Sequence, residues 1–235
     1  CILCHWPSQA PGNLGLPMPG VEVKLVPSAE KMEMRVKGPN VTPGYLNNDL
    51  ATKAAFDAEG FYCMGDAVKF VDEDQPSEGL QFDGRISENF KLTTGTWVQT
   101  GEIRTAVITA LSPLAQDAAI TGEGQAELGL LLFLNRAGCA RAFGLAEDVT
   151  FEELAQNENL RDTLKEKLRK FNAEQKGSSR SIARLMVMTD RPSIENNEIT
   201  DKGYLNQQAT LSARKTLVDH LYAPPASDTV VIVIN

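Results

Sequence analysis

The pattern of apolar residues changes once along this chain, close to Gly84 and Arg85. Before that point, short runs such as VEVKLV (21–26) and KMEMRVKG (31–38) alternate apolar and polar residues, which is typical of half-buried β-strands. Beyond it, NENLRDTLKEKLRKFNAEQKG (157–177) repeats leucine every four residues, which is typical of a helix with one apolar face. The change predicts two domains that differ in fold.

We therefore expect a β-rich domain over residues 1–84 and an α+β domain over residues 85–235. The first domain also holds one short predicted helix, DLATKAAFD (49–57). In the second, a hairpin near Thr93–Gly95 precedes a helix, and one last helix is expected over NQQATLSARKTLVDHLYA (206–223). The short apolar runs that predict buried strands are QDAAITG (116–122), ELGLLLFLN (127–135) and SIARLMVMTD (181–190).

The composition excludes some classes of partner. The formal net charge of −8 argues against nucleic acid or an anionic membrane surface as the main partner. No apolar run approaches the roughly 18 residues of a membrane-spanning helix, and we see no export signal, so we expect a cytoplasmic protein without a membrane span. The chain opens without methionine and in mid-pattern, so we expect it to be part of a longer protein; its oligomeric state stays unknown.

Cys1 and Cys4 form a Cys-x-x-Cys pair beside His5, an arrangement that also occurs in metal sites. No second pair of ligands follows at the spacing of a zinc site. We interpret the cysteines as reduced thiols and predict no metal centre.

Asp66 is the first of three polar positions that a structural role explains poorly. It follows Gly65 in FYCMGD (61–66), where a carboxylate leaving a strand can accept hydrogen bonds from both hydroxyl groups of a ribose. Gly-Asp pairs are also common in turns, so a hairpin turn is the structural alternative.

The second position is the segment FDGRISENFKLTTGTWVQTGEIR (82–104), which combines Arg85, Lys91, Gly95 and Trp97. A hinge that swings a lysine and a loop into an active site would need such a mixture, although a surface hairpin would also explain it. Arg85 could reach a diol or a phosphate, or be a solvated hinge cation. Lys91 could equally be a strand-face lysine, and Trp97 could belong to the core.

The third position is Lys202, in the polar, glycine-containing segment NNEITDKGYLNQ (196–207) that precedes the last helix. A mobile lysine there could neutralise charge that develops on a carboxylate and an α-phosphate during adenylation. The structural alternative is an ordinary surface lysine. No Walker-type or Rossmann-type glycine loop occurs in the sequence.

Taken in order, these segments resemble the C-terminal half of the adenylate-forming acyl-CoA synthetases. Those enzymes carry a Gly-Tyr…Gly-Asp run, then a Gly-Arg hinge with a Lys…Gly loop after it, and then a late lysine. The hinge segment and the late lysine segment look most like those of bacterial feruloyl-CoA synthases, and the resemblance extends from about Gly12 to Ala223. The matching segments are VTPGYLNNDLATKAAFDAEGFYCMGD (41–66), FDGRISENFKLTTGTWVQTGEIR (82–104) and NEITDKGYLNQ (197–207).

The resemblance implies a fold and two half-reactions. The fold would be α+β, with the β-barrel-like end of the large adenylate-forming domain over 1–84 and a small mobile lid domain over 85–235. The enzyme would adenylate a carboxylic acid with ATP and Mg²⁺, and then transfer the acyl group to coenzyme A as co-substrate. The acid would be ferulate or another hydroxycinnamate, as in phenylpropanoid degradation.

The resemblance also implies a role for each matching residue. Asp66 would bind the ribose hydroxyls of ATP with help from Arg85, and Lys202 would promote formation of the acyl-adenylate. The implied hinge is Ser87, and the loop that forms the thioester would hold Lys91, Gly95 and Trp97.

The sequence departs from the family pattern at Met64, where threonine is usual, and at Ser87, where the hinge usually carries Asp or Lys. Lys91 and Gly95 are four residues apart, as in longer-chain acyl-CoA synthetases. A medium-chain or long-chain fatty acyl-CoA synthetase is therefore an alternative.

The family's phosphate-binding loop and most of its acid pocket are expected upstream of Cys1, together with most ligands of Mg²⁺. We therefore predict no adenylation by the isolated chain. A truncated, non-catalytic nucleotide-binding or interaction module is the alternative of another class.

Overall fold

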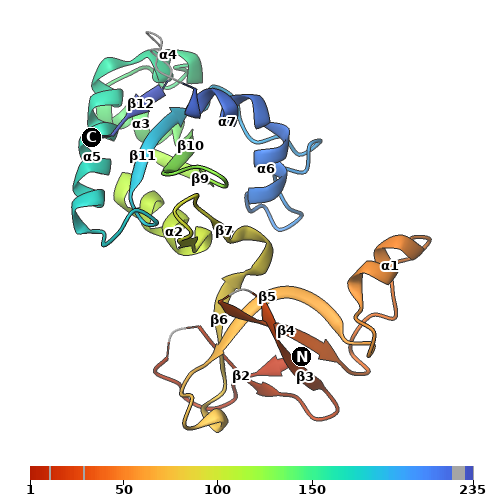
Figure 1. Cartoon of the computed structure of the whole chain (residues 1–235). Helices are drawn as coiled ribbons and strands as arrows, with labels where there is room; N and C mark the ends of the chain where they lie inside the picture. The colour runs from red at the N-terminus through yellow and green to blue at the C-terminus, as the bar shows by residue number, and fades with distance from the viewer. Residues whose placement is uncertain (11, 29, 224–230, 235) are drawn as a thin grey trace. The chain divides into compact units, whose positions relative to one another are not determined.

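The structure is a computed structural model that describes residues 1–10, 12–28, 30–223 and 231–234, apart from the side chain of Ser87. It divides into two compact units, unit 1 (Cys1–Ser87) and unit 2 (Glu88–Asn235), which Figure 1 shows in red to yellow and in yellow-green to blue. The division follows Ser87, whereas the sequence places the change of pattern at Gly84 and Arg85.

The described residues of unit 1 form an antiparallel sheet with the strand order β1-β2-β6-β5-β4-β3. The alternating runs pair as a hairpin in which Val23 faces Val36 and Leu25 faces Met34. One face of the sheet carries a small core of Met34, Val36, Val68 and Leu80. The strands are β1 (Ile2–Leu3), β2 (Asn13–Pro17), β3 (Glu22–Ser28), β4 (Lys31–Lys37), β5 (Tyr62–Phe70) and β6 (Leu80–Arg85).

Helix α1 (Asp49–Ala55) projects from unit 1 and buries none of its own residues. It begins where the sequence predicts, because the side chain of Asn48 accepts a hydrogen bond from the backbone N–H of Ala51 at 3.0 Å. Leu46 and Leu50 are 92% and 83% exposed. Unit 1 therefore presents apolar side chains that its own core does not cover.

Unit 2 is built on a sheet with the strand order β12-β11-β10-β9, in which β10 runs parallel to β11 and antiparallel to β9. Every residue of β10 is buried, because helices cover both faces of the sheet. Successive side chains of a strand point to opposite faces, so Leu130 and Leu132 pack in one core while Leu131 and Phe133 pack in the other. The strands are β9 (Ala115–Thr121), β10 (Leu128–Leu134), β11 (Ile182–Val187) and β12 (Val231–Val233).

The helices of unit 2 fall into two layers. Helices α2 and α5 cover one face of the sheet, and α6 and α7 cover the other (Figure 1). The leucine repeat of α5 faces the larger core, and Asn157 caps its first turn. The helices are α2 (Thr100–Leu111), α3 (Arg136–Phe143), α4 (Phe151–Gln156), α5 (Glu158–Glu174), α6 (Gln207–Ala213) and α7 (Lys215–Tyr222).

The predicted fold class, α+β with a β-rich first part, is confirmed. One detail of the prediction is wrong, and two short helices are additional to it. The last helix is broken at Arg214, whose backbone leaves the helical conformation (φ −105°, ψ 25°) and separates α6 from α7. The short helices α3 and α4 were not predicted. No helix among the described residues is both long enough and apolar enough to cross a membrane.

Candidate functional site

Asp66 and Arg85 face each other across β5 and β6 in unit 1. Asp66 lies within β5 rather than in a hairpin turn, and Gly65 before it (φ +71°) accompanies a bulge in the pairing of β5 with β4. Nε of Arg85 lies 2.9 Å from Oδ1 of Asp66, and Nη1 of Arg85 donates to the carbonyl oxygen of Met64 at 3.2 Å. The carboxylate is 19% exposed and the guanidinium 52% exposed. The pair thus presents a cation at the surface with a partly covered anion beside it.

The predicted hinge lies directly after this pair. Gly84 adopts φ +94° within β6, and a 3-10 turn at Ile86–Glu88 follows Arg85. Ser87 lies in that turn, at the end of unit 1. Its side chain lies outside the described part of the structure, so its role as a hinge stays a prediction.

Lys91, Gly95 and Trp97 lie on the predicted hairpin, which β7 (Phe90–Lys91) and β8 (Trp97–Val98) form in unit 2. The turn closes with a hydrogen bond from the N–H of Gly95 to the carbonyl oxygen of Leu92 at 2.9 Å, and Gly95 adopts φ +83°. Nζ of Lys91 lies 5.1 Å from the ring centroid of Trp97, within cation–π range. Trp97 is half-buried rather than part of the core, so this face of the hairpin carries an aromatic ring, a cation and an open turn.

Lys202 lies at the tip of a second hairpin, residues 198–206, which we name the Lys202 hairpin. The N–H of Thr200 donates to the carbonyl oxygen of Tyr204 at 2.8 Å, and the N–H of Asn206 donates to that of Glu198 at 2.8 Å. Gly203 closes the turn at φ +80°. Lys202 is exposed, but the backbone that carries it is hydrogen-bonded rather than a loose polar loop.

Sequence reasoning missed the residues that hold this hairpin. Arg214 is buried and binds both Asp190 and Glu198, and the buried side chain of Gln207 binds the backbone of β9. An arginine and a glutamine inside a predicted helix carry no signal of this kind, because their partners lie far away in the sequence.

Helix α2 connects the β7–β8 hairpin with the Lys202 hairpin. It begins at Thr100, directly after β8, and its Arg104 makes two hydrogen bonds to the carboxylate of Asp117, at 2.8 and 2.7 Å. Nη1 of Arg104 also donates to the carbonyl oxygen of Leu205, at the end of the Lys202 hairpin. The segment after Lys91 and the segment after Lys202 are therefore connected through one arginine.

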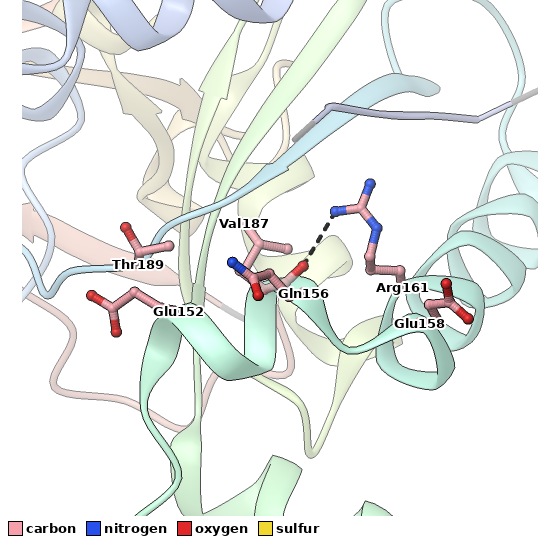
Figure 2. Close-up of a pocket in the computed structure, with 7 residues that line it drawn as sticks. Glu152, Gln156, Glu158, Arg161, Val187 and Thr189 are labelled. Carbon is pink, nitrogen blue, oxygen red and sulfur yellow. Dashed lines mark hydrogen bonds between the residues drawn. The ribbon is translucent and has the colours of Figure 1, made fainter. Parts of the chain in front are cut away.

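The pocket in Figure 2 lies elsewhere in unit 2, between α4, the start of α5 and the end of β11. It has a volume of about 420 Å³, and its lining includes Arg161, whose Nη1 donates to the carbonyl oxygen of Ala155 at 3.3 Å. None of the predicted site residues lines it. No cluster of three or more metal-ligating side chains occurs among the residues that the structure describes.

Comparison with known proteins identifies a family for residues 88–225. The model of the AMP-binding enzyme C-terminal domain matches residues 88–225, which is more than half of the chain. The chain is 25% identical over 228 residues to the probable acyl-activating enzyme 16 of Arabidopsis thaliana, covering 90% of this chain and 31% of that protein. It is 34% identical over 113 residues to the long-chain-fatty-acid–CoA ligase 6 of Rattus norvegicus, covering 45% and 16%.

A likeness to solved structures supports the fold. The adenylation domain of a carboxylic acid reductase from Segniliparus rugosus, solved with AMP and a co-purified carboxylic acid, superposes with a TM-score of 0.68 at 22% identity. The match covers 89% of this chain and 32% of that one. The chain spans about a third of the length of the first curated relatives that it matches.

Proposed function

This chain belongs to the AMP-binding enzyme C-terminal domain family, and from that premise we propose that it forms the C-terminal part of an ATP-dependent acid:CoA ligase. In the first half-reaction a carboxylate oxygen of the acid attacks the α-phosphorus of ATP, and pyrophosphate leaves. In the second, the thiolate of coenzyme A attacks the carbonyl carbon of the acyl-adenylate, and AMP leaves. In both steps negative charge develops on new atoms in the transition state. Positively charged side chains that are held in place can stabilise that charge.

Lys202 is the residue that carries the proposal. It is an exposed cation at the tip of a hydrogen-bonded hairpin within the family's domain. A lysine ammonium held beside the α-phosphate stabilises the charge that builds up as the carboxylate attacks, and it needs no proton transfer to do so. Lys202 is therefore assigned to the first half-reaction.

Asp66 and Arg85 are assigned to the nucleotide. A partly covered carboxylate accepts hydrogen bonds from ribose hydroxyls, and the exposed guanidinium beside it attracts phosphate. ATP would enter with Mg²⁺, whose ligands and the groups that bind the triphosphate are expected outside these 235 residues.

Lys91, Gly95 and Trp97 are assigned to the second half-reaction. The open turn at Gly95 and the Lys91–Trp97 contact offer a surface along which the pantetheine arm of coenzyme A could lie. The two half-reactions would then use two different hairpins of unit 2. Between the two steps unit 2 would rotate about the turn at Ile86–Glu88.

The acid substrate is proposed to be ferulate or a related hydroxycinnamate, on the resemblance of 82–104 and 197–207 to feruloyl-CoA synthases. A fatty acid is the second candidate, which the match to a long-chain-fatty-acid–CoA ligase and the four-residue Lys91–Gly95 spacing favour. Thioester formation by the complete enzyme, compared on ferulate and on a series of fatty acids, separates the two.

The activity itself is tested by acid-dependent exchange of pyrophosphate into ATP. The complete enzyme is expected to catalyse the exchange, and the 235-residue chain alone is expected not to. Exchange by the isolated chain, or none by the complete enzyme with any acid of either class, would contradict the proposal.

A further inference from the structure

The Lys202 hairpin is tied to the rest of unit 2 at both of its ends. Its first residue, Glu198, is 1% exposed, and its last residue, Asn206, directly precedes the buried Gln207. The tip between them carries the exposed Lys202. Whatever fixes the two ends also fixes where the lysine ammonium can reach.

Arg214 holds the first end. Its Nε donates to Oε1 of Glu198 at 2.7 Å and its Nη2 to Oε2 at 3.0 Å, while Nη1 and Nη2 donate to the two oxygens of Asp190 at 2.7 and 2.8 Å. The guanidinium is 7% exposed and lies 5.0 Å from the ring centroid of Phe133. One arginine thus binds Asp190, shortly after β11, and Glu198, where the hairpin starts.

Gln207 holds the second end. Its Oε1 accepts from the backbone N–H of Ile120 at 3.1 Å and its Nε2 donates to the carbonyl oxygen of the same residue at 2.5 Å. β9 is an edge strand of the sheet, so the side-chain amide of Gln207 takes the place that a neighbouring strand's peptide would occupy. Only a group with both a donor and an acceptor can satisfy this pair of contacts.

The stability of the fold alone does not explain these buried polar contacts. Removing the charges of Arg214 and Glu198 from water costs free energy that offsets most of their mutual attraction. Apolar residues of similar size often stabilise a core as well or better. Burial by itself lowers the pKa of Arg214, but its hydrogen bonds to Asp190 and Glu198 outweigh that effect and raise the pKa, so the arginine stays charged. What directional hydrogen bonds add over apolar packing is a fixed geometry.

We propose that Arg214 and Gln207 are positioning residues for Lys202: Gln207 clamps the end of its hairpin to β9, and Arg214 clamps the start to the segment after β11, so that the ammonium is held ready for adenylation. The inference rests on the proposed role of Lys202 and goes beyond it, because neither residue touches a substrate. Loosening either clamp lets the tip shift, and a displacement of about 1 Å of a positioned group can cost on the order of 100-fold in rate.

The test measures both half-reactions of the complete enzyme in Arg214→Lys and Gln207→Met, beside Lys202→Ala. Arg214→Lys keeps the charge but loses the fork that binds two carboxylates at once. Both clamp variants are expected to lower kcat of adenylation by roughly 10- to 100-fold, with KM for ATP changed less than about 2-fold. Thioester formation from supplied acyl-adenylate is expected to stay within about 2-fold of wild type.

Matched controls come from the neighbouring positions. Lys215→Met changes an exposed cation next to Arg214, and Gln208→Met changes the exposed glutamine next to Gln207. Both are expected to leave the two half-reactions unchanged. Hydrogen exchange supplies a second readout, because the amides of Thr200, Gly203 and Asn206 should exchange faster in the clamp variants while those of β10 stay protected.

The outcomes separate the inference from its premise. If Lys202→Ala leaves adenylation intact, the proposed role of Lys202 is wrong and the clamp has nothing to position. If Lys202→Ala impairs adenylation but both clamp variants behave like their controls, the positioning role is wrong. If Arg214→Lys loses both half-reactions together, Arg214 has a structural role and does not position Lys202. The result for Gln207→Met, which removes no charge, then shows whether Gln207 positions Lys202.

Discussion

Unit 1 holds Asp66 and Arg85 on a sheet with one small core. Unit 2 holds Lys202 on a hairpin whose ends are bound by Arg214 and Gln207, beside a sheet that is covered on both faces. In unit 1 the charged groups are fixed by a cross-strand pair that reaches the surface. In unit 2 the Arg214–Glu198 pair at the start of the hairpin is buried, and Lys202 at its tip is exposed. The two units therefore show two ways to fix the position of a cation. Arg85 is held by direct pairing with a carboxylate, whereas Lys202 is held through contacts to the backbone segment that carries it.

The two units also differ in how completely their cores are buried. Strand β10 is buried along its whole length between two layers of helices. The core of unit 1 is surrounded by half-covered residues, and Tyr45, Leu46 and Leu50 remain exposed. Stability in unit 2 should therefore depend on packing and buried polar contacts, and stability in unit 1 should depend more on its charges.

The two tryptophans make the comparison measurable, because Trp6 belongs to unit 1 and Trp97 to unit 2. Changing one to phenylalanine leaves the fluorescence of the other to follow its own unit. Unfolding of each unit can then be followed in a variant that keeps only that unit's tryptophan.

Arg214→Met should give the largest effect. It leaves the carboxylate of Glu198 buried without its cation, which typically costs about 3–5 kcal/mol of the free energy of unfolding. The double variant Arg214→Met, Glu198→Met removes both charges and should recover most of that loss. Urea unfolding followed by Trp97 measures both, and a cost below about 1 kcal/mol for the single variant would show that the pair is solvated.

Leu130→Ala should come next. The side chain is fully buried in the larger core of unit 2, so its removal should cost about 2–5 kcal/mol. Leu46→Ala in unit 1 is the matched change at a side chain that is 92% exposed, and it should stay within about 0.5 kcal/mol. Similar losses of unfolding free energy in the two variants would contradict the difference between the two cores.

Tyr222 should make unit 2 sensitive to alkali. Burial raises the pKa of Tyr222 from 10 to about 12, helped by the nearby Glu127 and opposed by the hydrogen bond between the hydroxyl groups of Tyr222 and Thr121. The folded chain then keeps a proton that the unfolded chain loses, so stability falls as the pH rises from 10 to 12, by on the order of 2 kcal/mol. Tyr222→Phe should flatten that part of the curve, measured by urea unfolding at several pH values; an unchanged slope would count against the raised pKa.

Asp57 should make unit 1 sensitive to acid, and by less, because its ion pairs lie near the surface. Hydrogen bonds from Lys24, at 2.7 Å between Nζ and Oδ2, and from the N–H of Phe61 hold the pKa of Asp57 below its ordinary value of 3.8. The contribution is therefore present above pH 3.8 and is lost as the pH falls below it. Trp6 fluorescence between pH 5 and pH 2 (about the range in which carboxylates titrate) reports it. The same acid response in Asp57→Asn would assign the effect to other groups.

Much of this fold follows from local patterns. The alternation in 31–38 predicts β4, and the leucine repeat of 157–177 predicts α5, because each pattern has the period of one element. Helix α4 could also have been predicted, since Thr150 and Glu153 form a capping box three residues apart.

The clamps of the Lys202 hairpin could not be predicted in this way. Nothing in LSARKTL (211–217) indicates a break at Arg214, which has no glycine or proline beside it. Its partners Asp190 and Glu198 lie 24 and 16 residues away in the sequence, and only the fold brings them together. The role proposed for Lys202 rests on the ordered motifs, whereas those motifs do not predict the hydrogen bonds that hold its hairpin.

The most direct test of the central claim, that unit 2 supplies a fixed cation for adenylation, is the separate measurement of the two half-reactions in Lys202→Ala of the complete enzyme. Acid-dependent exchange of pyrophosphate into ATP should fall by about 100-fold or more, while thioester formation from supplied acyl-adenylate should continue at close to the wild-type rate. An equal loss of both half-reactions, or no loss of exchange, would contradict the account.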